Sequence, residues 1–495
     1  MTDGGPKTAS HQAGKNGKRV AVIGGGITGL SAAQRLISTD PTVQVVIFES
    51  TERFGGIIRT EHSDGFLTEL GPDSFITNKP GGIQLCDDIG FTDQLIPTDA
   101  EFRRSLVLRN GVPQPVPDGF MLMAPARPWA IATTPVLSVG GKIRLLREVF
   151  VRPKTNPEED ESLADFVRRR FGRQALDRLI QPLIGGIYTS DPEKLSLKAT
   201  LPRFIQMEQE YGSVIRATLA EQRQKKGRPD ADSGSGARYG LFATPKYGLG
   251  SLVDAILAWL QESGRATLRS NLSVSSLSLN PATGGAANPS WNVSLPNLPD
   301  ETFDAVILTL PTHTAADLLN DDSFADLTQA LREIKYASSA IVVTEHRLTD
   351  FRHSLDAFGL VVPAIENRKV LAVSFTSRKF PGRAPAGHVL LRTFVGGAMQ
   401  PELLRHSDEE ITDFVKQELS TMFGMANAPA FCRVVRYNRA MPQYHVGHIL
   451  RVAEIERLTA AHTGLHLAGS AYHGVGLPDS ILSGRSAADE VVHGS

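Results

Sequence analysis

The sequence predicts an α/β protein organised around a Rossmann-like unit, and three observations near its N-terminus support this prediction. Residues 20–23 (VAVI) are apolar and partly β-branched, which is typical of a buried strand in a parallel sheet. A glycine pattern, G-x-G-x-x-G, begins at Gly24, and apolar residues then recur with helical spacing. A second apolar segment, residues 43–48, ends at Glu49. Strand, glycine-rich turn, helix and strand in this order form a dinucleotide-binding unit.

Each glycine of this pattern has a physical task. Gly24 permits a tight turn, Gly26 lets a pyrophosphate approach the backbone, and Gly29 lets the helix pack closely on the strand. The helix N-terminus offers N–H groups and a partial positive charge to the phosphates. Glu49 stands 20 residues after Gly29 and is placed to accept hydrogen bonds from an adenosine ribose. The cofactor contacts expected from this unit are Gly24, Gly25, Gly26, Ile27, Thr28, Gly29, Glu49 and Ser50.

Length and composition describe an ordinary folded protein of two or three domains. Of its 495 residues 41% are hydrophobic and 21% are charged, and the net charge of −1 gives no general attraction to nucleic acid. The two cysteines, Cys86 and Cys432, have no metal-site companions and cannot form a disulfide framework, which favours a reducing compartment. Apolar runs are too short for a transmembrane helix. We expect a cytoplasmic protein whose residues 1–17 are a disordered tail, not a secretory signal.

The segment after Glu49 narrows the choice of dinucleotide cofactor. Residues 53–56 (RFGG) resemble the R-x-G-G extension of flavoproteins of the amine oxidase and protoporphyrinogen oxidase superfamily, where it lies along the FAD pyrophosphate. Residues 65–75 (GFLTELGPDSF) then indicate a short strand that runs into a glycine-proline turn. In that superfamily a segment of this kind brings backbone to the flavin ring. The resemblance implies FAD as the cofactor, with contacts from Arg53, Gly56, Ile57, Gly71, Pro72, Asp73 and Ser74.

Two surface interpretations stay open in the next part of the chain. Residues 102–111 (FRRSLVLRNG) are expected to form an exposed hairpin arm, either a solvated charged edge strand or a clamp whose guanidinium groups bind a substrate carboxylate. Residues 121–131 contain apolar clusters, and residues 142–147 are basic. An apolar face beside a basic one suits a peripheral membrane surface, but it also describes any surface helix. Paired glycines at 185–186 indicate that another group approaches the backbone closely.

The second half of the chain returns to the nucleotide-binding domain twice. Residues 269–277 alternate like a strand, and in the superfamily the Val of such a segment, here Val274, meets the adenine through its backbone. Residues 303–311 return to the parallel sheet, and the strand-like runs within 331–435 predict a mixed sheet over a pocket. Residues 465–470 form a last strand before a glycine-rich turn and a helix. The free N–H groups of this turn and of the helix start are expected to face the pyrimidine edge of the flavin. The expected contacts are Ser470, Val475, Gly476 and Leu477.

Taken together, these motifs resemble the oxygen-dependent protoporphyrinogen oxidase and coproporphyrinogen III oxidase family over residues 18–493. The resemblance implies a six-electron oxidation of a porphyrinogen in haem biosynthesis, with hydride transfer to FAD N5 and reduction of dioxygen to hydrogen peroxide. It implies no catalytic side chain and no metal. Some family members oxidise protoporphyrinogen IX and others coproporphyrinogen III, and we expect this chain to tolerate both. A homodimer and peripheral contact with the cytoplasmic membrane are left open.

The resemblance also implies a domain plan and substrate contacts. The FAD domain, of the glutathione-reductase type, is expected at 18–85, 244–310 and 438–495, with a mixed-sheet substrate domain at 86–113 and 311–437. A helical, membrane-associating insertion is expected at 114–243. The residues implied for the substrate are Arg104, Gly186, Val361 and Phe375. One departure is Ser190, where many relatives have a second glycine before Asp-Pro.

Three alternatives share parts of this pattern. A flavin-dependent amine oxidase has the same FAD architecture, but its usual A-G-E motif is replaced here by residues 468–470 (AGS), and 7% aromatic content leaves little for an aromatic cage. A carotenoid desaturase would favour a longer apolar tunnel. A flavin-binding porphyrin carrier without turnover is the alternative outside enzymes.

Overall fold

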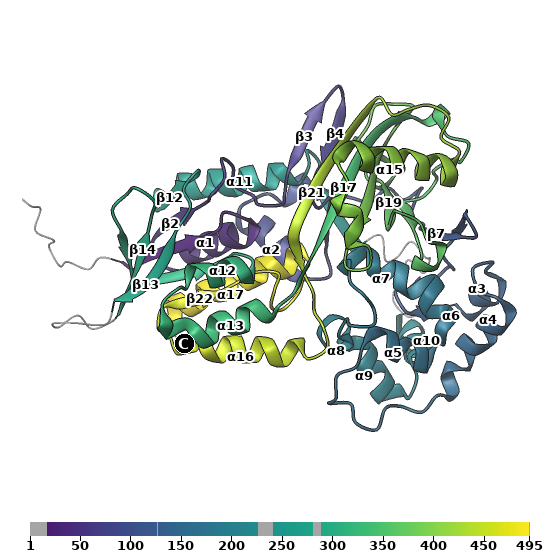
Figure 1. The fold of residues 1–495 in the computed structure, drawn as a ribbon, viewed down its shortest axis with the longest axis horizontal. Helices are drawn as coiled ribbons and strands as arrows, with labels where there is room; N and C mark the ends of the chain where they lie inside the picture. Colours follow the sequence, from purple (N-terminus) through teal and green to yellow (C-terminus); the bar gives the residue numbers. More distant parts are fainter. Residues whose placement is uncertain (1–16, 126, 226–240, 281–288, 495) are drawn as a thin grey trace, which may run out of the picture.

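The computed structural model describes residues 17–125, 127–225, 241–280 and 289–494 (Figure 1). The tail expected at 1–17 therefore lies outside the described residues, except for Gly17. Within these ranges the chain forms a parallel sheet with its helices, a mixed sheet, and a layer of helices that lies beside the mixed sheet.

The nucleotide-binding domain is built on a five-stranded parallel sheet, as predicted. β1 occupies its centre because residues 20–23 are apolar on both faces and buried, which suits a parallel strand covered on both sides. The strand order is β12 (Ala266–Arg269), β2 (Gln44–Phe48), β1 (Arg19–Ile23), β16 (Ala305–Leu308) and β22 (Leu465–Leu467).

Each face of this sheet has its own cover. One face carries four helices, whose apolar residues share one core with the sheet: α1 (Ile27–Thr39), α2 (Pro80–Asp88), α11 (Leu249–Glu262) and α17 (Leu477–His493). The other face carries an antiparallel sheet and three helices: β13 (Ser276–Asn280), β14 (Ser290–Ser294), β15 (Glu301–Phe303), α12 (Thr312–Leu318), α13 (Ala325–Glu333) and α16 (His448–Ala460).

Helices α12 and α13 differ from the expected domain plan, which placed residues 311–334 in the substrate domain. Leu327 and Leu331 of α13 share a core with Ile23 of β1, so these helices cover the parallel sheet. The apolar face of a helix shows that it needs a partner but does not show which sheet that partner is.

The substrate domain contains a seven-stranded mixed sheet. Its order is β21 (Phe431–Pro442), β17 (Tyr336–Arg347), β20 (His388–Gly396), β19 (Ala372–Phe375), β18 (Gly359–Val361), β7 (Leu106–Arg109) and β8 (Val112–Pro115). Helix α15 (Asp408–Phe423) packs on one face of this sheet. The expectation of an exposed arm at 102–111 is wrong, because β7 is an inner strand whose residues Leu106 and Leu108 lie in the core under α15.

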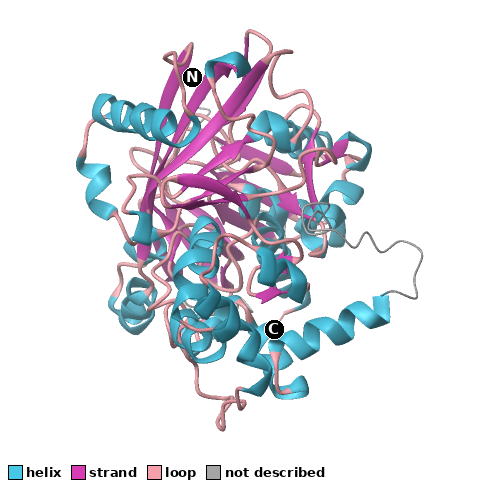
Figure 2. Cartoon of the chain, turned by 90° about the vertical axis from the view of Figure 1, so that its right-hand side faces the viewer, coloured by secondary structure: helices cyan, strands magenta, loops and turns pink. Residues whose placement is uncertain are grey.

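Residues 128–225 form the helical insertion, which lies on the side of the mixed sheet away from α15 (Figures 1 and 2). Its helices are α3 (Pro128–Thr133), α4 (Val139–Leu146), η2 (Arg147–Phe150), α5 (Leu163–Arg170), α6 (Arg173–Ala175), η3 (Leu176–Ile180), α7 (Gln181–Tyr188), α8 (Leu197–Thr200), α9 (Pro202–Tyr211) and α10 (Val214–Lys225). Met123 and Ile131 are buried in its core, whereas Trp129 of the same apolar run is 77% exposed, so only part of the run at 121–131 faces solvent.

A buried ionic cluster holds the insertion together. The guanidinium of Arg170 pairs with Glu148 and lies 3.0 Å from Glu208, and all three side chains are excluded from solvent. Ser213 Oγ donates to Glu148 at 2.5 Å. A buried charge is tolerated only when it is paired and hydrogen-bonded, and here three helices and the turn before α10 supply the partners.

Candidate cofactor and substrate site

The glycine turn between β1 and α1 is tied to the end of β2. Gly24 N–H donates to the Phe48 carbonyl at 2.9 Å, and Gly25 N–H donates to Glu49 Oε2 at 2.9 Å. Gly26 is the N-cap of α1 and carries no side-chain cap, so the first turn keeps N–H donors for a ligand. A Cβ built on Gly26 would meet only Gly56 Cα, at 3.9 Å. The turn is therefore an open backbone cradle of the kind that accepts a pyrophosphate.

Close packing explains Gly29. A Cβ there would lie 2.0 Å from the Gly24 carbonyl oxygen, so any other residue would push α1 away from the turn.

The R-x-G-G segment lies directly against this cradle. Gly55 N–H donates to the Gly25 carbonyl at 2.7 Å. The Arg53 guanidinium donates to the Ile58 and Gly56 carbonyls at 2.8 and 2.5 Å, which closes the segment into a compact loop. The structure thus shows Arg53 shaping backbone around the cradle, and its contact with a cofactor stays a prediction.

The adenosine side of the expected site forms beside Glu49. Thr51 N–H donates to Glu49 Oε1 at 2.9 Å, and Leu272 N–H donates to the Glu49 carbonyl at 2.9 Å. This pairing brings the segment that contains Val274 next to the acidic residue, although the two are more than 200 residues apart in sequence. Ser50 Oγ lies 3.4 Å from Glu49 Oε1.

The turn at Gly71–Ser74 lies on the R-x-G-G loop and is held by the substrate domain. A Cβ on Gly71 would lie 1.8 Å from the Ile57 carbonyl oxygen, so the two expected cofactor segments touch. Asp73 receives Lys379 Nζ at 2.9 Å and Arg392 at 3.1 Å. Burial alone would raise the pKa of Asp73, but the charges of Lys379 and Arg392 hold it well below its usual range.

Sequence reasoning missed the residues that hold this turn. Arg392 on β20 also donates to the Gly71 carbonyl, and Tyr437 on β21 donates to the Leu70 carbonyl at 2.5 Å. These partners lie more than 300 residues from the turn, and no local pattern in the sequence marks them.

Helix α17, which follows the glycine-rich turn near the C-terminus, crosses helix α1, which follows the N-terminal glycine turn. Gly484 of α17 packs on Thr28 of α1 so closely that a Cβ would lie 2.2 Å from the Thr28 carbonyl oxygen. Gly476 is the N-cap of α17 and has no side-chain cap, so this helix also keeps N–H donors. The expected contacts Ser470, Val475, Gly476 and Leu477 therefore precede or begin a helix that packs against α1.

Two of the four expected substrate residues meet. Gly186 at the end of α7 is exposed, and a Cβ there would lie 4.0 Å from Val361 Cγ1 on β18. Phe375 lies elsewhere: it is fully buried under α15, where its ring packs against Phe423 at 5.4 Å between centroids. The expected contact of Phe375 with a macrocycle is wrong, because β19 turns this side chain toward the α15 face of the sheet.

Lys79 and the adjacent Arg103 and Arg104 are three candidate cations for substrate carboxylates, and their surroundings differ. Arg104 is exposed, and its Nε donates to the Asp356 carbonyl. Arg103 instead donates to Thr98, and Lys79 pairs with Asp479 at 2.7 Å. Contact of Arg104 with a substrate carboxylate stays a prediction.

Ser190 has a definite partner. Its side chain is buried, and its Oγ donates to Gln443 Oε1 at 2.5 Å. A glycine at this position would leave the Gln443 amide oxygen without this donor. The serine thus links the turn after α7 to the segment that follows β21.

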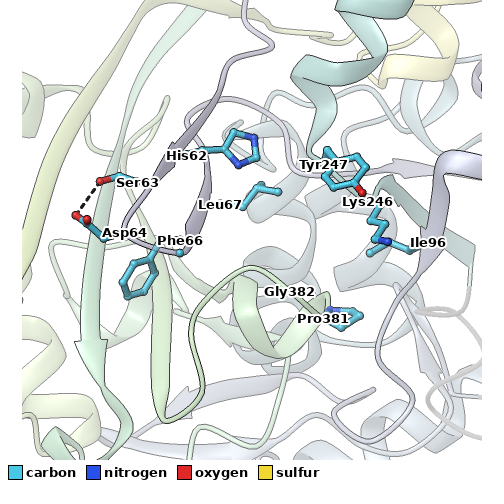
Figure 3. A pocket seen from close by; sticks show the side chains of 11 residues that line it. His62, Ser63, Asp64, Phe66, Leu67, Ile96, Lys246, Tyr247, Pro381 and Gly382 are labelled. Carbon is cyan, nitrogen blue, oxygen red and sulfur yellow. Dashed lines mark hydrogen bonds between the residues drawn. The ribbon is translucent and has the colours of Figure 1, made fainter.

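A cavity of about 560 Å³ lies elsewhere in the molecule (Figure 3). His62 and Leu67 come from the hairpin of β3 (Thr60–Ser63) and β4 (Phe66–Glu69), and Tyr247 and Pro381 lie opposite them. Its lining contains none of the expected cofactor or substrate residues. This cavity is distinct from the candidate site.

The fold and the site define a flavoprotein: a dinucleotide-binding domain with two uncapped helix N-termini, an R-x-G-G loop, and a substrate sheet that holds the Gly71–Ser74 turn. Residues 27–492 match the family described as flavin containing amine oxidoreductase, and the chain belongs to this family. The predicted cofactor, FAD, is confirmed by this membership.

Named relatives extend over nearly the whole chain. The coproporphyrinogen III oxidase of Staphylococcus aureus is 32% identical over 476 residues, which are 96% of this chain and 99% of that protein. Protoporphyrinogen oxidase 2, chloroplastic/mitochondrial, of Arabidopsis thaliana is 29% identical over 499 residues, 96% of this chain and 94% of that protein. A crystal structure from Exiguobacterium sp. 255-15, assigned provisionally as a protoporphyrinogen oxidase, has a TM-score of 0.82 at 28% identity and covers 97% of this chain and 99% of its own.

Proposed function

We propose that this protein oxidises coproporphyrinogen III to coproporphyrin III in haem biosynthesis, with FAD as the cofactor and dioxygen as the electron acceptor. Six electrons and six protons leave the substrate, and three dioxygen molecules take them up as three hydrogen peroxide molecules. The observation that carries the proposal is the similarity to porphyrinogen oxidases across 96% of the chain.

This reaction depends more on how the protein orients the substrate against the flavin than on acid–base catalysis by side chains. Each methylene bridge of a porphyrinogen lies between electron-rich pyrroles, so loss of a hydride leaves a delocalised cation. Bound FAD supplies the two-electron acceptor. Gly186 and Val361 approach each other from the helical insertion and the mixed sheet, and a macrocycle that packs against both elements would be held in a fixed orientation.

The four propionates of coproporphyrinogen III favour an open, wet edge of the site. Burying an unpaired carboxylate costs several kcal/mol, so the propionates must reach cations or water. Arg104 is exposed and lies just before β7 of the mixed sheet, so its guanidinium can meet a propionate that extends into solvent. Protoporphyrinogen IX, with two propionates, is the second substrate that the same site would accept.

A comparison of kcat/KM for the two porphyrinogens tests the proposal. The FAD-loaded protein, supplied with each porphyrinogen under air, should form porphyrin fluorescence and hydrogen peroxide, with the higher kcat/KM for coproporphyrinogen III. A higher kcat/KM for protoporphyrinogen IX would reverse the substrate assignment. Oxidation of an amine or a carotenoid precursor instead would point to the other flavin-dependent classes, and binding without turnover would point to a carrier.

We also propose that the helical insertion contacts the cytoplasmic membrane at its surface. Trp129, Val139 and Phe150 are more than 70% exposed, and Ile143 lies one turn after Val139 on α4. Exposed apolar side chains with the exposed Arg147 nearby suit an anionic lipid surface. In the described part of the chain, no helix is long and apolar enough to span a bilayer.

Flotation with liposomes tests this contact. Vesicles that contain anionic lipid should carry the protein upward, and W129S/F150S should stay with the soluble fraction. The matched control is L450S, because Leu450 is 78% exposed on α16, outside the insertion. Equal flotation of all three proteins would contradict the proposed surface.

A further inference from the structure

A short segment after β21 connects the helical insertion to the FAD domain. This junction segment, residues 443–448, pairs with the insertion through its backbone: Ser196 N–H donates to the Tyr444 carbonyl at 2.8 Å, and Val446 N–H donates to the Lys194 carbonyl at 2.9 Å. The Ser190–Gln443 hydrogen bond adds a side-chain link. The backbone of Tyr444 is therefore fixed to the insertion.

The side chain of Tyr444 reaches in the other direction. Its hydroxyl donates to the Ser470 carbonyl at 2.7 Å and accepts a hydrogen bond from Gly474 N–H at 2.7 Å. The side chain is 2% exposed, so water does not compete for these bonds. The two partners are the ends of the loop 470–474, which leads directly into Val475, Gly476 and the start of α17.

His448 holds the middle of the same loop. Its ring stacks on Tyr444 at 3.8 Å between centroids and 16° between planes, and its Nε2–H donates to the Tyr472 carbonyl at 3.2 Å. Burial lowers the pKa of His448 to about 4, which keeps the ring neutral near pH 7. Two stacked side chains of the junction segment thus hold three backbone groups of one loop.

The loop has a reason to need such support. Gly474 has φ +149°, and Gly469, just before the loop, has φ +140°. Glycines of this kind give a chain many alternative conformations, so a loop between them is poorly defined by its own backbone. The N–H groups that follow can stabilise charge on a ligand only when their direction is fixed beforehand.

We propose that Tyr444 is a positioning residue for the flavin: through its hydroxyl it fixes the loop 470–474, and so orients the N-terminus of α17 toward the pyrimidine side of the cofactor. The inference rests on the proposed function for the identity of the cofactor. It assigns to the junction segment a task in the redox site, although Tyr444 belongs by packing to the core of the helical insertion.

The test compares Tyr444→Phe with Tyr188→Phe. Each variant removes one hydroxyl that donates a hydrogen bond to a backbone carbonyl, but Tyr188 is half-buried and its hydroxyl donates to the Thr200 carbonyl at 3.3 Å, within the insertion. Tyr444→Phe should bind FAD roughly tenfold more weakly, because two hydrogen bonds to the loop are lost. The midpoint potential of its bound FAD should become more negative, because the charge gained on reduction is stabilised less. Tyr188→Phe should keep the wild-type FAD affinity and potential.

Both measurements use the cofactor alone, so they stand apart from the substrate assignment. The wild type could fail to oxidise either porphyrinogen while Tyr444→Phe still binds FAD more weakly than the wild type and Tyr188→Phe. That result would overturn the proposed function and leave the role of Tyr444 intact. A Tyr444→Phe protein with lowered Tm but wild-type FAD affinity and potential would show a structural role only and overturn the inference. If that variant does not accumulate as folded protein, His448→Phe carries the same test, because it keeps the stack and removes the bond to Tyr472.

Discussion

The guanidinium of Arg392 lies 3.1 Å from the carboxylate of Asp73, inside the interface between the mixed sheet and the expected flavin segment. Lys379 approaches the same carboxylate at 2.9 Å, so two cations from the substrate domain hold one acid of the FAD domain. This buried arrangement ties the position of the substrate sheet to the turn at Gly71–Ser74. A change at the pair should therefore affect both stability and the site.

Arg392→Met should destabilise the protein strongly. The variant leaves Asp73 buried with one cation instead of two, and breaking a buried pair costs about 3–5 kcal/mol. Arg433→Met is the matched control, because Arg433 pairs with Glu61 at the surface, where a pair contributes about 0–1 kcal/mol. Urea unfolding at pH 7 measures both. Equal losses in the two variants would contradict the importance assigned to the buried pair.

The same pair predicts a direction of acid sensitivity. The pKa of Asp73 is held below its ordinary value in the folded state, so the stabilisation by the pair is complete above about pH 4. It is lost as the pH falls further, because the unfolded chain then binds the proton more readily. Asp73→Asn should remove this part of the acid dependence below pH 4.

A buried histidine predicts a second pH dependence at milder acidity. Burial lowers the pKa of His346 to about 4, and within the described structure neither ring nitrogen has a hydrogen-bond partner. The unfolded chain binds a proton below about pH 6.5, so stability should fall by about 1.4 kcal/mol per pH unit between pH 6.5 and 4. Urea midpoints at pH 7 and pH 5 should show a smaller loss for His346→Phe than for the wild type. An unchanged pH slope in that variant would contradict the prediction.

Gly26→Val should yield a folded protein without flavin. A side chain there has open space in the apoprotein, with Gly56 Cα as the nearest atom at 3.9 Å, but it would fill the pyrophosphate cradle. Flavin per polypeptide after gel filtration is the measurement. Gly140→Val on α4, where a Cβ meets only Ser138 Oγ at 4.0 Å, should retain stoichiometric flavin. Full flavin content in Gly26→Val would remove the cradle from the cofactor site.

Arg104→Ala should lower kcat/KM for coproporphyrinogen III by roughly tenfold, mainly through KM, because one charge-assisted hydrogen bond to a propionate is lost. Arg103→Ala is the control, since that guanidinium is directed to Thr98. Equal kinetics of Arg104→Ala and the wild type on both porphyrinogens would place Arg104 outside the substrate site.

The local parts of this structure were predictable because their determinants are contiguous. β1, the glycine turn, α1, β2 and Glu49 follow one another within about 30 residues, and the physical task of each is visible in its residue type. The turn at Gly71–Ser74 was also predictable as a turn from its glycine and proline, and its role toward the cofactor stays a prediction. Its partners were not predictable, because Arg392 lies in a distant sheet and Lys379 lies on the short helix that follows β19.

The errors have related causes. The sequence marks Phe375 as an aromatic residue in a strand, but only the packing of α15 decides which face of β19 is the core. The charges at 103–104 suggested an exposed arm, whereas the apolar run at 106–108 is buried between β18 and β8. Tyr444 carried no signal, since its role depends on a loop 26 residues away along the chain.

The most direct test of the central claim is an assay in which the purified protein alone oxidises coproporphyrinogen III under air. The FAD-loaded protein should form coproporphyrin III, seen by its fluorescence, together with three hydrogen peroxide molecules per porphyrin, and flavin-free Gly26→Val should not exceed autoxidation. Porphyrin formation at the same rate with wild type, Gly26→Val and heat-inactivated protein would contradict the account.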